Sequence, residues 1–261
     1  MDGSEGLGVR SYPGRPPPLV ALHGFTQTGA MFGELAELLG SEVLAPDLPG
    51  HGRSSGIAGS FANAVIGVGK ILAAFDEPMP LLGYSQGGRV ALAVALERPE
   101  LVSHLVVLST TPGVEDGPER AERRRVDETW AADLKADGLE AFLERWLSNP
   151  MFKGLERRGE AWRAADRAAR LENTAEGLAG ALVGMGQGTQ PYFGGRLQEL
   201  RVPVLVIAGQ LDQKSISLAT SMHHSLLRGS FRVVPDAGHA VIGEQPRAVA
   251  DLVADFLAGS V

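Results

Sequence analysis

The sequence predicts an α/β fold, a mostly parallel and doubly wound sheet with one all-helical insertion. Short apolar runs that do not alternate recur along the chain, and such runs are typical of strands buried on both faces of a parallel sheet. Segments of helical periodicity lie between them, which favours a doubly wound arrangement. With 261 residues, of which 44% are hydrophobic and 21% charged, the chain is long enough to bury such a core without disulfide bonds.

The predicted strands are six apolar runs, at 19–22, 43–45, 81–83, 105–108, 204–207 and 231–234. Helical patterns follow several of these runs, as at 89–96 and 249–257. Residues 1–17 precede the first run and are rich in glycine, proline and serine, a composition that predicts an irregular leader.

One long segment breaks the alternation of strands and helices. From about Glu115 to Leu200 one helical pattern follows another with no convincing strand, and ten of the twenty arginines lie between Arg120 and Arg170. We expect an all-helical insertion between two strands to fold as a cap over the sheet. The predicted parts are therefore an irregular leader at 1–17, an α/β core formed by 18–112 and 197–261, and a helical cap at 113–196.

Composition and missing motifs exclude several classes of protein. Cysteine is absent, which excludes disulfide scaffolds, thiolate metal sites and cysteine nucleophiles. The formal net charge of −7 argues against binding to nucleic acid. Apolar stretches fall short of the roughly 18 residues of a membrane span, and residues 1–5 lack the features of a secretory signal. We expect a cytoplasmic protein with no membrane partner, whose oligomeric state the sequence does not predict.

Metal and nucleotide motifs are also missing. The sequence contains neither H-E-x-x-H nor G-x-x-x-x-G-K-[ST]. Residues 184–188 have the form G-x-G-x-G, but they follow no predicted strand and lack the spacing of the third glycine. We therefore expect neither a metal ion nor a cofactor.

The residues 83–87, Gly-Tyr-Ser-Gln-Gly, form a G-x-S-x-G motif between a predicted strand and a predicted helix. In that context the motif predicts a nucleophile elbow, a tight turn that exposes the hydroxyl of Ser85. The positive end of the following helix faces the same place and favours developing negative charge.

A serine at such a turn needs a base, and the base needs an acid to orient it. Asp212 follows one predicted strand and His239 follows the last, so the order Ser85, Asp212, His239 is that of α/β-hydrolases. Both lie just past the carboxyl ends of strands, where open α/β sheets place their sites. Asp236 is an alternative acid, although it lies only three residues before His239.

An oxyanion hole needs two N–H donors, which we assign to Gln86, directly after the serine, and to Phe25, after the first predicted strand. The remaining histidines have structural interpretations. His23 and His51 are expected to brace loops, as is the run 47–54, whereas His104, His223 and His224 are expected at a strand edge or on exposed helix.

Arginines point to an anionic substrate. Arg89 lies one helical turn after Ser85, so both side chains are expected to border one cavity. A guanidinium there suits a substrate carboxylate, which it binds in a bidentate manner. Several cap arginines, including Arg123 and Arg170, are further candidates, but spacing does not distinguish among them.

The elbow and the cap resemble the 2-succinyl-6-hydroxy-2,4-cyclohexadiene-1-carboxylate synthases, lyases of menaquinone biosynthesis in the α/β-hydrolase superfamily. The resemblance runs from about Pro18 to the C-terminus and is carried by the segments 83–91, 112–113, 119–123, 127–130, 142–146, 150–152, 170–173, 184–191 and 209–214. The cap segments are more specific than the triad, which the wider superfamily shares. Two positions depart from the family pattern, Ser215 in place of a frequent Phe and Ile242 in place of a frequent His.

The resemblance implies elimination of pyruvate from 2-succinyl-5-enolpyruvyl-6-hydroxy-3-cyclohexene-1-carboxylate, a tricarboxylate, in menaquinone or phylloquinone biosynthesis. It implies that Ser85, His239 and Asp212 are catalytic, with Ser85 as a general base and no cofactor. It also implies that Arg89, Arg123 and Arg170 bind substrate carboxylates, and that the cavity is lined by Tyr84, Trp146 and Phe152.

Two alternatives remain open. One is an esterase or carbon–carbon bond hydrolase that acts on a small anionic substrate, and the arginines of the cap argue against a neutral ester. The other is a ligand-binding protein that has lost catalysis, which the presence of all three triad residues disfavours.

Overall fold

The computed structural model describes residues 6–259, and within them seven strands form one sheet. The strands follow the order β1-β3-β2-β4-β5-β6-β7. Their bounds are β1 (Val9–Tyr12), β2 (Arg15–Leu22), β3 (Ser41–Pro46), β4 (Met79–Tyr84), β5 (Val102–Leu108), β6 (Val204–Gly209) and β7 (Gly229–Val234). All neighbours are parallel except β1, which pairs with β3 in the antiparallel sense. The predicted fold class is confirmed.

The six apolar runs all lie in strands, but the expectation of an irregular leader at 1–17 is wrong from residue 9 onward. Residues 9–12 form β1, and β2 already begins at Arg15. The edge strand β1 is only partly buried, so it lacks the apolar run that marks a central strand. Its backbone hydrogen bonds to β3 make it a strand, although its composition does not predict one.

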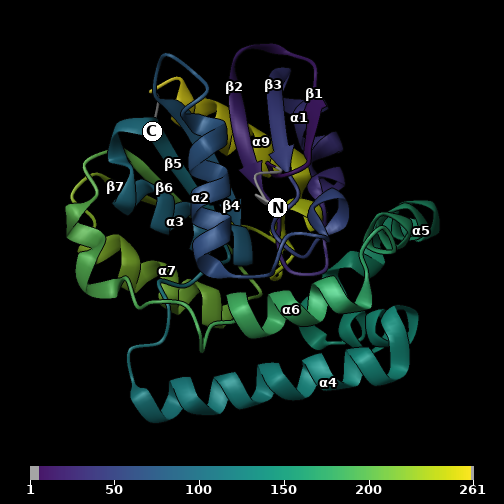
Figure 1. Cartoon of the computed structure of the whole chain (residues 1–261). Coiled ribbons are helices and arrows are strands. Elements are labelled where there is room, and N and C mark those ends of the chain that lie inside the picture. The colour runs from purple at the N-terminus through teal and green to yellow at the C-terminus, as the bar shows by residue number, and fades with distance from the viewer. Residues whose placement is uncertain (1–5, 260–261) are drawn as a thin grey trace.

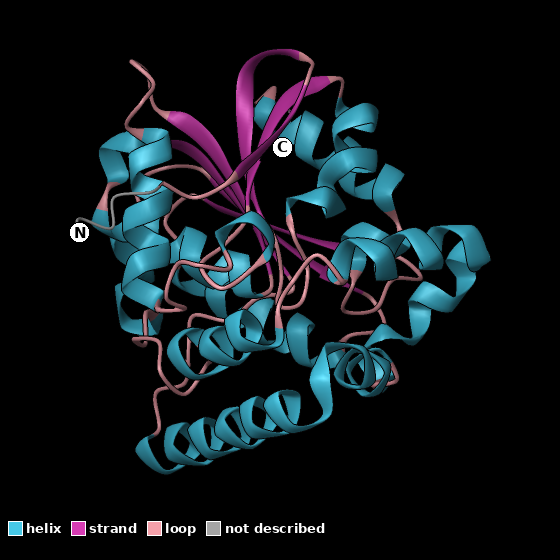
Figure 2. Ribbon diagram, turned by 45° about the vertical axis from the view of Figure 1, so that its right-hand side comes forward, coloured by secondary structure: helices cyan, strands magenta, loops and turns pink. Residues whose placement is uncertain are grey.

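Helices cover both faces of the sheet (Figure 2). On one face α2 (Phe61–Leu72), α3 (Gln86–Glu97) and α7 (Gln213–Ser225) pack with the strands into one hydrophobic cluster. On the other face α1 (Gly33–Leu39), α8 (Val241–Glu244) and α9 (Pro246–Leu257) form a second cluster. Central strands are therefore buried on both sides, which explains why their sequences are continuously apolar.

All the regular secondary structure between β5 and β6 is helical. It contains α4 (Gly117–Leu147), α5 (Gly159–Arg170) and α6 (Ala175–Met185), and the 3₁₀ segments η4 (Pro150–Arg158) and η5 (Gly194–Glu199). In Figure 1, α4 lies outermost and α6 lies between it and the sheet. A small apolar cluster of their own joins α4 and α6. The helix α4 is interrupted at Gly138, where φ is 83°, a conformation that favours glycine.

Short 3₁₀ segments complete the chain: η1 (Gly29–Phe32), η2 (Gly52–Ser54) and η3 (Pro99–Leu101). Among residues 6–259, the helices include none with the length and apolar character to cross a membrane. The carboxyl ends of β2, β4, β6 and β7 are directed toward the α4–α6 segment. The residues that follow these strand ends face that segment across a cavity.

Candidate active site

Ser85 occupies the sharp turn between β4 and α3. Its backbone has φ 50° and ψ −108°, a conformation that costs energy in a residue with a Cβ. Residues at and just after the end of β5 hold this turn, because the Ser85 N–H donates to the Leu108 carbonyl (2.8 Å) and the Ser85 carbonyl accepts from the Thr110 hydroxyl (2.7 Å). A Cβ at Gly83 would lie 2.4 Å from the carbonyl oxygen of Gly87, and one at Gly87 would lie 2.2 Å from a carbonyl oxygen of β2. The motif therefore needs both glycines for space.

The side chains of Ser85, His239 and Asp212 form a connected chain of hydrogen bonds. Ser85 Oγ lies 3.1 Å from His239 Nε2, and His239 Nδ1 lies 2.7 Å from Asp212 Oδ2. The histidine and aspartate side chains are each 14% exposed. This geometry lets the imidazole take the serine proton while the carboxylate orients the ring.

Asp212 is also bound by the helix that follows it. It is the N-cap of α7, and its Oδ1 accepts from the backbone N–H of Ser215 (3.0 Å), while the Ser215 hydroxyl donates to Oδ2 (2.5 Å). Burial raises the pKa of Asp212, but the hydrogen bonds from His239 and Ser215 outweigh burial and lower it to about 2. The carboxylate is therefore ionised at neutral pH and stabilises a protonated imidazole.

Asp236, the alternative acid, lies in a turn after β7 with φ 56°. Its backbone N–H donates to Gln210 (3.1 Å) and its carbonyl accepts from Arg157, whereas the Nδ1 atom of His239 bonds to Asp212. The structure thus brings Asp212, and not Asp236, to the imidazole.

Phe25 and Gln86, the residues assigned to the oxyanion hole, line the same cavity as Ser85. Gln86 is the first residue of α3, where backbone N–H groups have no carbonyl one turn earlier to bind. The loop that carries Phe25 is held by two hydrogen bonds between Gly24 and Gln27, each of 3.2 Å. Both residues thus border the cavity that contains Ser85, and the donor role of their backbone N–H groups stays a prediction.

The cavity beside Ser85 has a volume of about 430 Å³ and lies between the sheet and the helical segment above it. It brings together every residue predicted for the site, namely Phe25, Tyr84, Ser85, Gln86, Arg89, Arg123, Trp146, Phe152, Arg170, Asp212 and His239. Within residues 6–259, no three histidine, aspartate or glutamate side chains are grouped as a metal-binding set would be.

Arg89 and Arg123 approach the cavity from the core and from α4. Burial lowers the pKa of Arg89 to about 10, so it stays charged at neutral pH, and its Nη1 donates to the Met185 carbonyl (2.7 Å) and to Gln190 (2.5 Å). Arg123 pairs with Asp127 (3.0 Å), and its side chain is 38% exposed. Burial raises the pKa of Asp127, although Arg123 opposes that rise. Both arginines can thus present positive charge to an anion in the cavity.

Arg170 is the most deeply buried of the three arginines, with 1% of its surface exposed. Its Nε donates to Asp166 (2.7 Å) and its Nη1 donates to the hydroxyl of Thr26. Asn173, one turn further, donates to the Thr26 carbonyl (2.8 Å). Arg170 therefore fastens α5 to the loop of Phe25 as well as lining the cavity.

Aromatic side chains line the cavity. The ring of Tyr84 lies 5.8 Å from that of His239, and burial raises the pKa of the Tyr84 hydroxyl. Phe152 packs edge-on against His239, with 6.4 Å between the ring centroids, and Trp146 packs against Phe25, with 5.2 Å between the ring centroids. These rings cover part of the imidazole, whose side chain is 14% exposed.

The cavity is also lined by side chains outside the predicted site, among them Trp130, Asn149, Gln187, Lys214 and Ser215. Lys214 had a local signal, since it lies two residues after Asp212 at the start of a helix. Ser215 departs from the family pattern, which by itself predicts no role for it. Trp130 and Gln187 lie in the segments 127–130 and 184–191 that carry the family resemblance, but no local pattern marks them, or Asn149, as residues that line the cavity.

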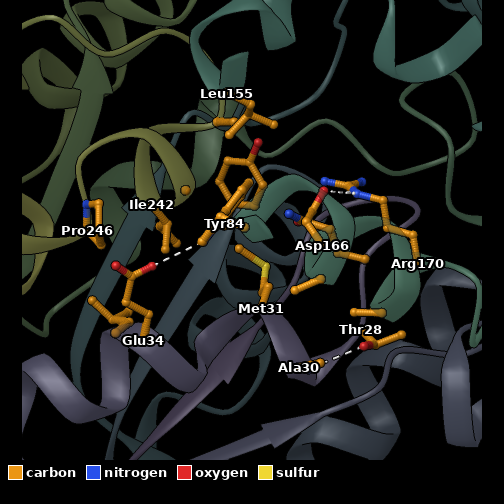
Figure 3. Close-up of a pocket in the computed structure, with 17 residues that line it drawn as sticks. Thr28, Ala30, Met31, Glu34, Tyr84, Leu155, Asp166, Arg170, Ile242 and Pro246 are labelled. Carbon is orange, nitrogen blue, oxygen red and sulfur yellow. Dashed lines mark hydrogen bonds and ion pairs between the residues drawn. The ribbon is translucent and has the colours of Figure 1, made fainter. Parts of the chain in front are cut away.

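A second cavity of about 230 Å³ lies beside the first and shares Gln27, Tyr84 and Arg170 with it (Figure 3). In Figure 3, Asp166 and Arg170 stand at one side and Glu34 at the other, with Met31 and Tyr84 between them. Ile242, the other departure, lines this second cavity and not the first. It thus makes part of that wall apolar.

The loop histidines behave as expected. His23 Nε2 accepts from the Leu48 N–H (2.9 Å), and Asp47 accepts from Gly29 (2.6 Å) and Arg53 (2.9 Å). Burial lowers the pKa of His23 to about 4 and that of His51 to about 3. Both are therefore neutral at neutral pH and brace the loops beside the site.

The chain is similar to known proteins over nearly its whole length. A family model described as the alpha/beta hydrolase fold matches residues 17–246. A protein of Bacillus subtilis (strain 168), provisionally named 2-succinyl-6-hydroxy-2,4-cyclohexadiene-1-carboxylate synthase, is 38% identical and covers 94% of this chain and 92% of its own. The synthase of that name from Salmonella agona (strain SL483) is 32% identical, with 96% and 98% covered.

Solved structures agree with these relatives. The structure of MenH from S. aureus superposes with a TM-score of 0.91 at 29% identity, covering 97% of this chain and 98% of that one. A malate-bound thermophilic esterase from Thermogutta terrifontis has a TM-score of 0.82 at 26% identity, covering 97% and 93%. The chain therefore belongs to the alpha/beta-hydrolase family, and within it to the 2-succinyl-6-hydroxy-2,4-cyclohexadiene-1-carboxylate synthases.

Proposed function

We propose that this protein is a lyase that eliminates pyruvate from 2-succinyl-5-enolpyruvyl-6-hydroxy-3-cyclohexene-1-carboxylate, giving 2-succinyl-6-hydroxy-2,4-cyclohexadiene-1-carboxylate in menaquinone or phylloquinone biosynthesis. The observation that carries the proposal is the pairing of a hydrogen-bonded Ser85–His239–Asp212 chain with three arginines in one cavity. A tricarboxylate loses hydration when it enters the cavity between the sheet and the helices, so its carboxylates need charged partners there.

Ser85 acts as the general base in this reaction. Ser85 Oγ takes the proton from the ring carbon next to the succinyl ketone while His239 Nε2, 3.1 Å away, takes the hydroxyl proton. Asp212 stabilises the resulting imidazolium through Nδ1. Electrons of the broken C–H bond move first into the enolate of the succinyl ketone, whose oxygen accepts hydrogen bonds from the backbone N–H groups of Phe25 and Gln86.

Collapse of this enolate completes the elimination. The ring double bond shifts, the C–O bond to the enolpyruvyl group breaks, and the leaving group departs as the enolate of pyruvate. The proton held by His239 returns to solvent or to that leaving group, which restores the neutral imidazole. Arg89, Arg123 and Arg170 hold the carboxylates, and Tyr84, Trp146 and Phe152 pack around the ring.

The direct test is incubation of the purified protein with the enolpyruvyl substrate, following pyruvate release and diene absorbance together. The proposal predicts equal amounts of pyruvate and diene without added metal or cofactor. A protein that hydrolyses small esters but releases no pyruvate would overturn the lyase assignment.

Hydrolysis of a small anionic ester, one that also carries a free carboxylate, is the second candidate. The similarity to an esterase solved with malate bound favours it, because the triad and the two backbone donors would also serve acyl transfer. In that case Ser85 forms an acyl-enzyme, a covalent intermediate that the lyase reaction does not require.

A further inference from the structure

Ser215 contacts both oxygens of the Asp212 carboxylate. Its backbone N–H donates to Oδ1 at 3.0 Å and its hydroxyl donates to Oδ2 at 2.5 Å. The same Oδ2 atom accepts from His239 Nδ1 at 2.7 Å. Ser215 is only 5% exposed, so water competes little for its hydroxyl.

We propose that Ser215 is a positioning residue that fixes the plane of the Asp212 carboxylate and limits how tightly the triad holds a proton on His239. Two donors from one residue prevent rotation of the carboxylate about its Cβ–Cγ bond. The Ser215 hydroxyl and the imidazole both donate to Asp212 Oδ2. The hydroxyl therefore offsets part of the negative charge on that oxygen and weakens its attraction for an imidazolium.

The acidity of Asp212 is consistent with this role. Burial raises its pKa, and hydrogen bonds from His239 and Ser215 together bring it down to about 2. Loss of the Ser215 hydroxyl would leave Oδ2 with the imidazole as its remaining side-chain donor among residues 6–259. An imidazolium would then be held more strongly and would give up its proton at a higher pH.

Other charged and titratable groups face the triad from the elements packed around it. They line the cavity of Ser85 or a further cavity of about 620 Å³ that His239 and Asp212 also border, and they are Tyr84, Arg89, Arg123, Asp127, Lys153, Glu156, Arg157, Arg170, Lys214 and Glu244. Asp236 lies in the turn before His239. Replacement of Ser215 by Ala changes none of these groups, so a shift of the pH profile in that variant reports on the hydroxyl.

The experiment compares Ser215→Ala and Ser215→Thr with Ser217→Ala, which removes an exposed hydroxyl on the same helix. Two rates are measured against pH for each protein: kcat/KM for pyruvate release, and inactivation of Ser85 by phenylmethanesulfonyl fluoride. We expect Ser215→Ala to lower both rates about three- to tenfold and to move their acidic limbs up by about half a pH unit. Ser215→Thr restores both, because it keeps the hydroxyl, and Ser217→Ala leaves both unchanged.

An acidic limb that stays in place in a folded Ser215→Ala protein would overturn the role in proton binding, and failure of Ser215→Thr to restore the rate would overturn the role in positioning. Circular dichroism verifies folding of each variant. The inference uses the triad of the proposed function, but inactivation of Ser85 does not depend on the lyase substrate. A protein that releases no pyruvate and still shows the shift in labelling would therefore contradict the proposed function and support the role of Ser215.

Discussion

Arg170 of α5 donates a hydrogen bond to the hydroxyl of Thr26, the residue that directly follows Phe25. Thr26 has φ 66°, a conformation that the surrounding contacts must maintain. Asn173 binds the carbonyl of the same residue at 2.8 Å. The helical segment above the sheet is thereby tied to the loop that carries one of the two proposed oxyanion donors.

This contact predicts different effects for two arginines of the cavity. Removing one partner of a buried ion pair costs about 3–5 kcal/mol, and Arg170 pairs with Asp166 while almost fully buried. We expect Arg170→Ala to lower the free energy of unfolding by about that amount, as measured by urea denaturation. Arg123 is 38% exposed, so Arg123→Ala should cost far less stability. Equal stability of the two variants would contradict the structural role of Arg170.

Arg123 is accordingly the cleaner probe of substrate charge. A hydrogen bond to a charged group is worth about 1.5–3 kcal/mol, so we expect Arg123→Ala to lower kcat/KM for pyruvate release roughly ten- to a hundredfold. Hydrolysis of p-nitrophenyl acetate, which carries no carboxylate, should change little. Arg125→Ala is the matched control, because Arg125 is 73% exposed and pairs with Glu122 on the outside of α4. If Arg123→Ala lowers both activities equally, the anionic substrate loses its support.

The triad geometry predicts an unequal effect of two aspartates. Ser85→Ala, His239→Ala and Asp212→Asn should each lower turnover by orders of magnitude without unfolding the protein. Asp236→Asn should have a mild effect, because the turn uses the backbone of Asp236. Steady-state kinetics decide the matter, and a crippled Asp236→Asn beside a mild Asp212→Asn would reverse the assignment.

A general-base role for Ser85 predicts that no covalent intermediate forms. Intact-mass spectrometry after a rapid quench should show unmodified protein throughout turnover, since the serine only moves a proton. A substrate-sized adduct on Ser85 would replace this mechanism with covalent catalysis. Phenylmethanesulfonyl fluoride provides the positive control for detecting an adduct.

Two buried histidines predict a fall in stability on mild acidification. Burial lowers the pKa of His23 to about 4 and that of His51 to about 3, against about 6.5 in the unfolded chain. Below pH 6.5 the unfolded state binds protons that the folded state does not, so each histidine removes stability as the pH falls toward its folded pKa. The expected slope is about 1.4 kcal/mol per pH unit for each.

Urea unfolding between pH 4 and 7 measures this slope. His51→Phe should reduce the slope by about 1.4 kcal/mol per pH unit, which is the contribution of one proton. Replacement of the exposed His224 by Gln should leave the slope unchanged. Asp212, with a pKa of about 2 in the folded state and about 3.9 in the unfolded chain, loses stability only below about pH 5. That loss is the same in all three proteins, so it cancels in the comparison. A slope that is the same in all three proteins would contradict the neutral, buried state of His51.

Local sequence determined the five inner strands, the edge strand β7 and the turn at Ser85. A strand buried on both faces must be apolar along its length, and the turn between β4 and α3 needs glycine where any Cβ would meet backbone within 2.5 Å. Both requirements involve residues close together in the chain, so they are visible as motifs. Ser85, Asp212 and His239 could be predicted from sequence because each lies shortly after the carboxyl end of a strand, namely β4, β6 and β7.

Only the tertiary structure decided the remaining features. The edge strand β1 depends on its pairing with β3, which no local pattern encodes. Sequence order favours Asp212 over Asp236 as the acid, but only the packing of β6 beside β7 brings Asp212 Oδ2 within 2.7 Å of His239 Nδ1. Arg170 meets Thr26 across 144 positions of sequence. Contacts between distant segments depend on how helices pack over the sheet, and periodicity reports only which face of each helix is apolar.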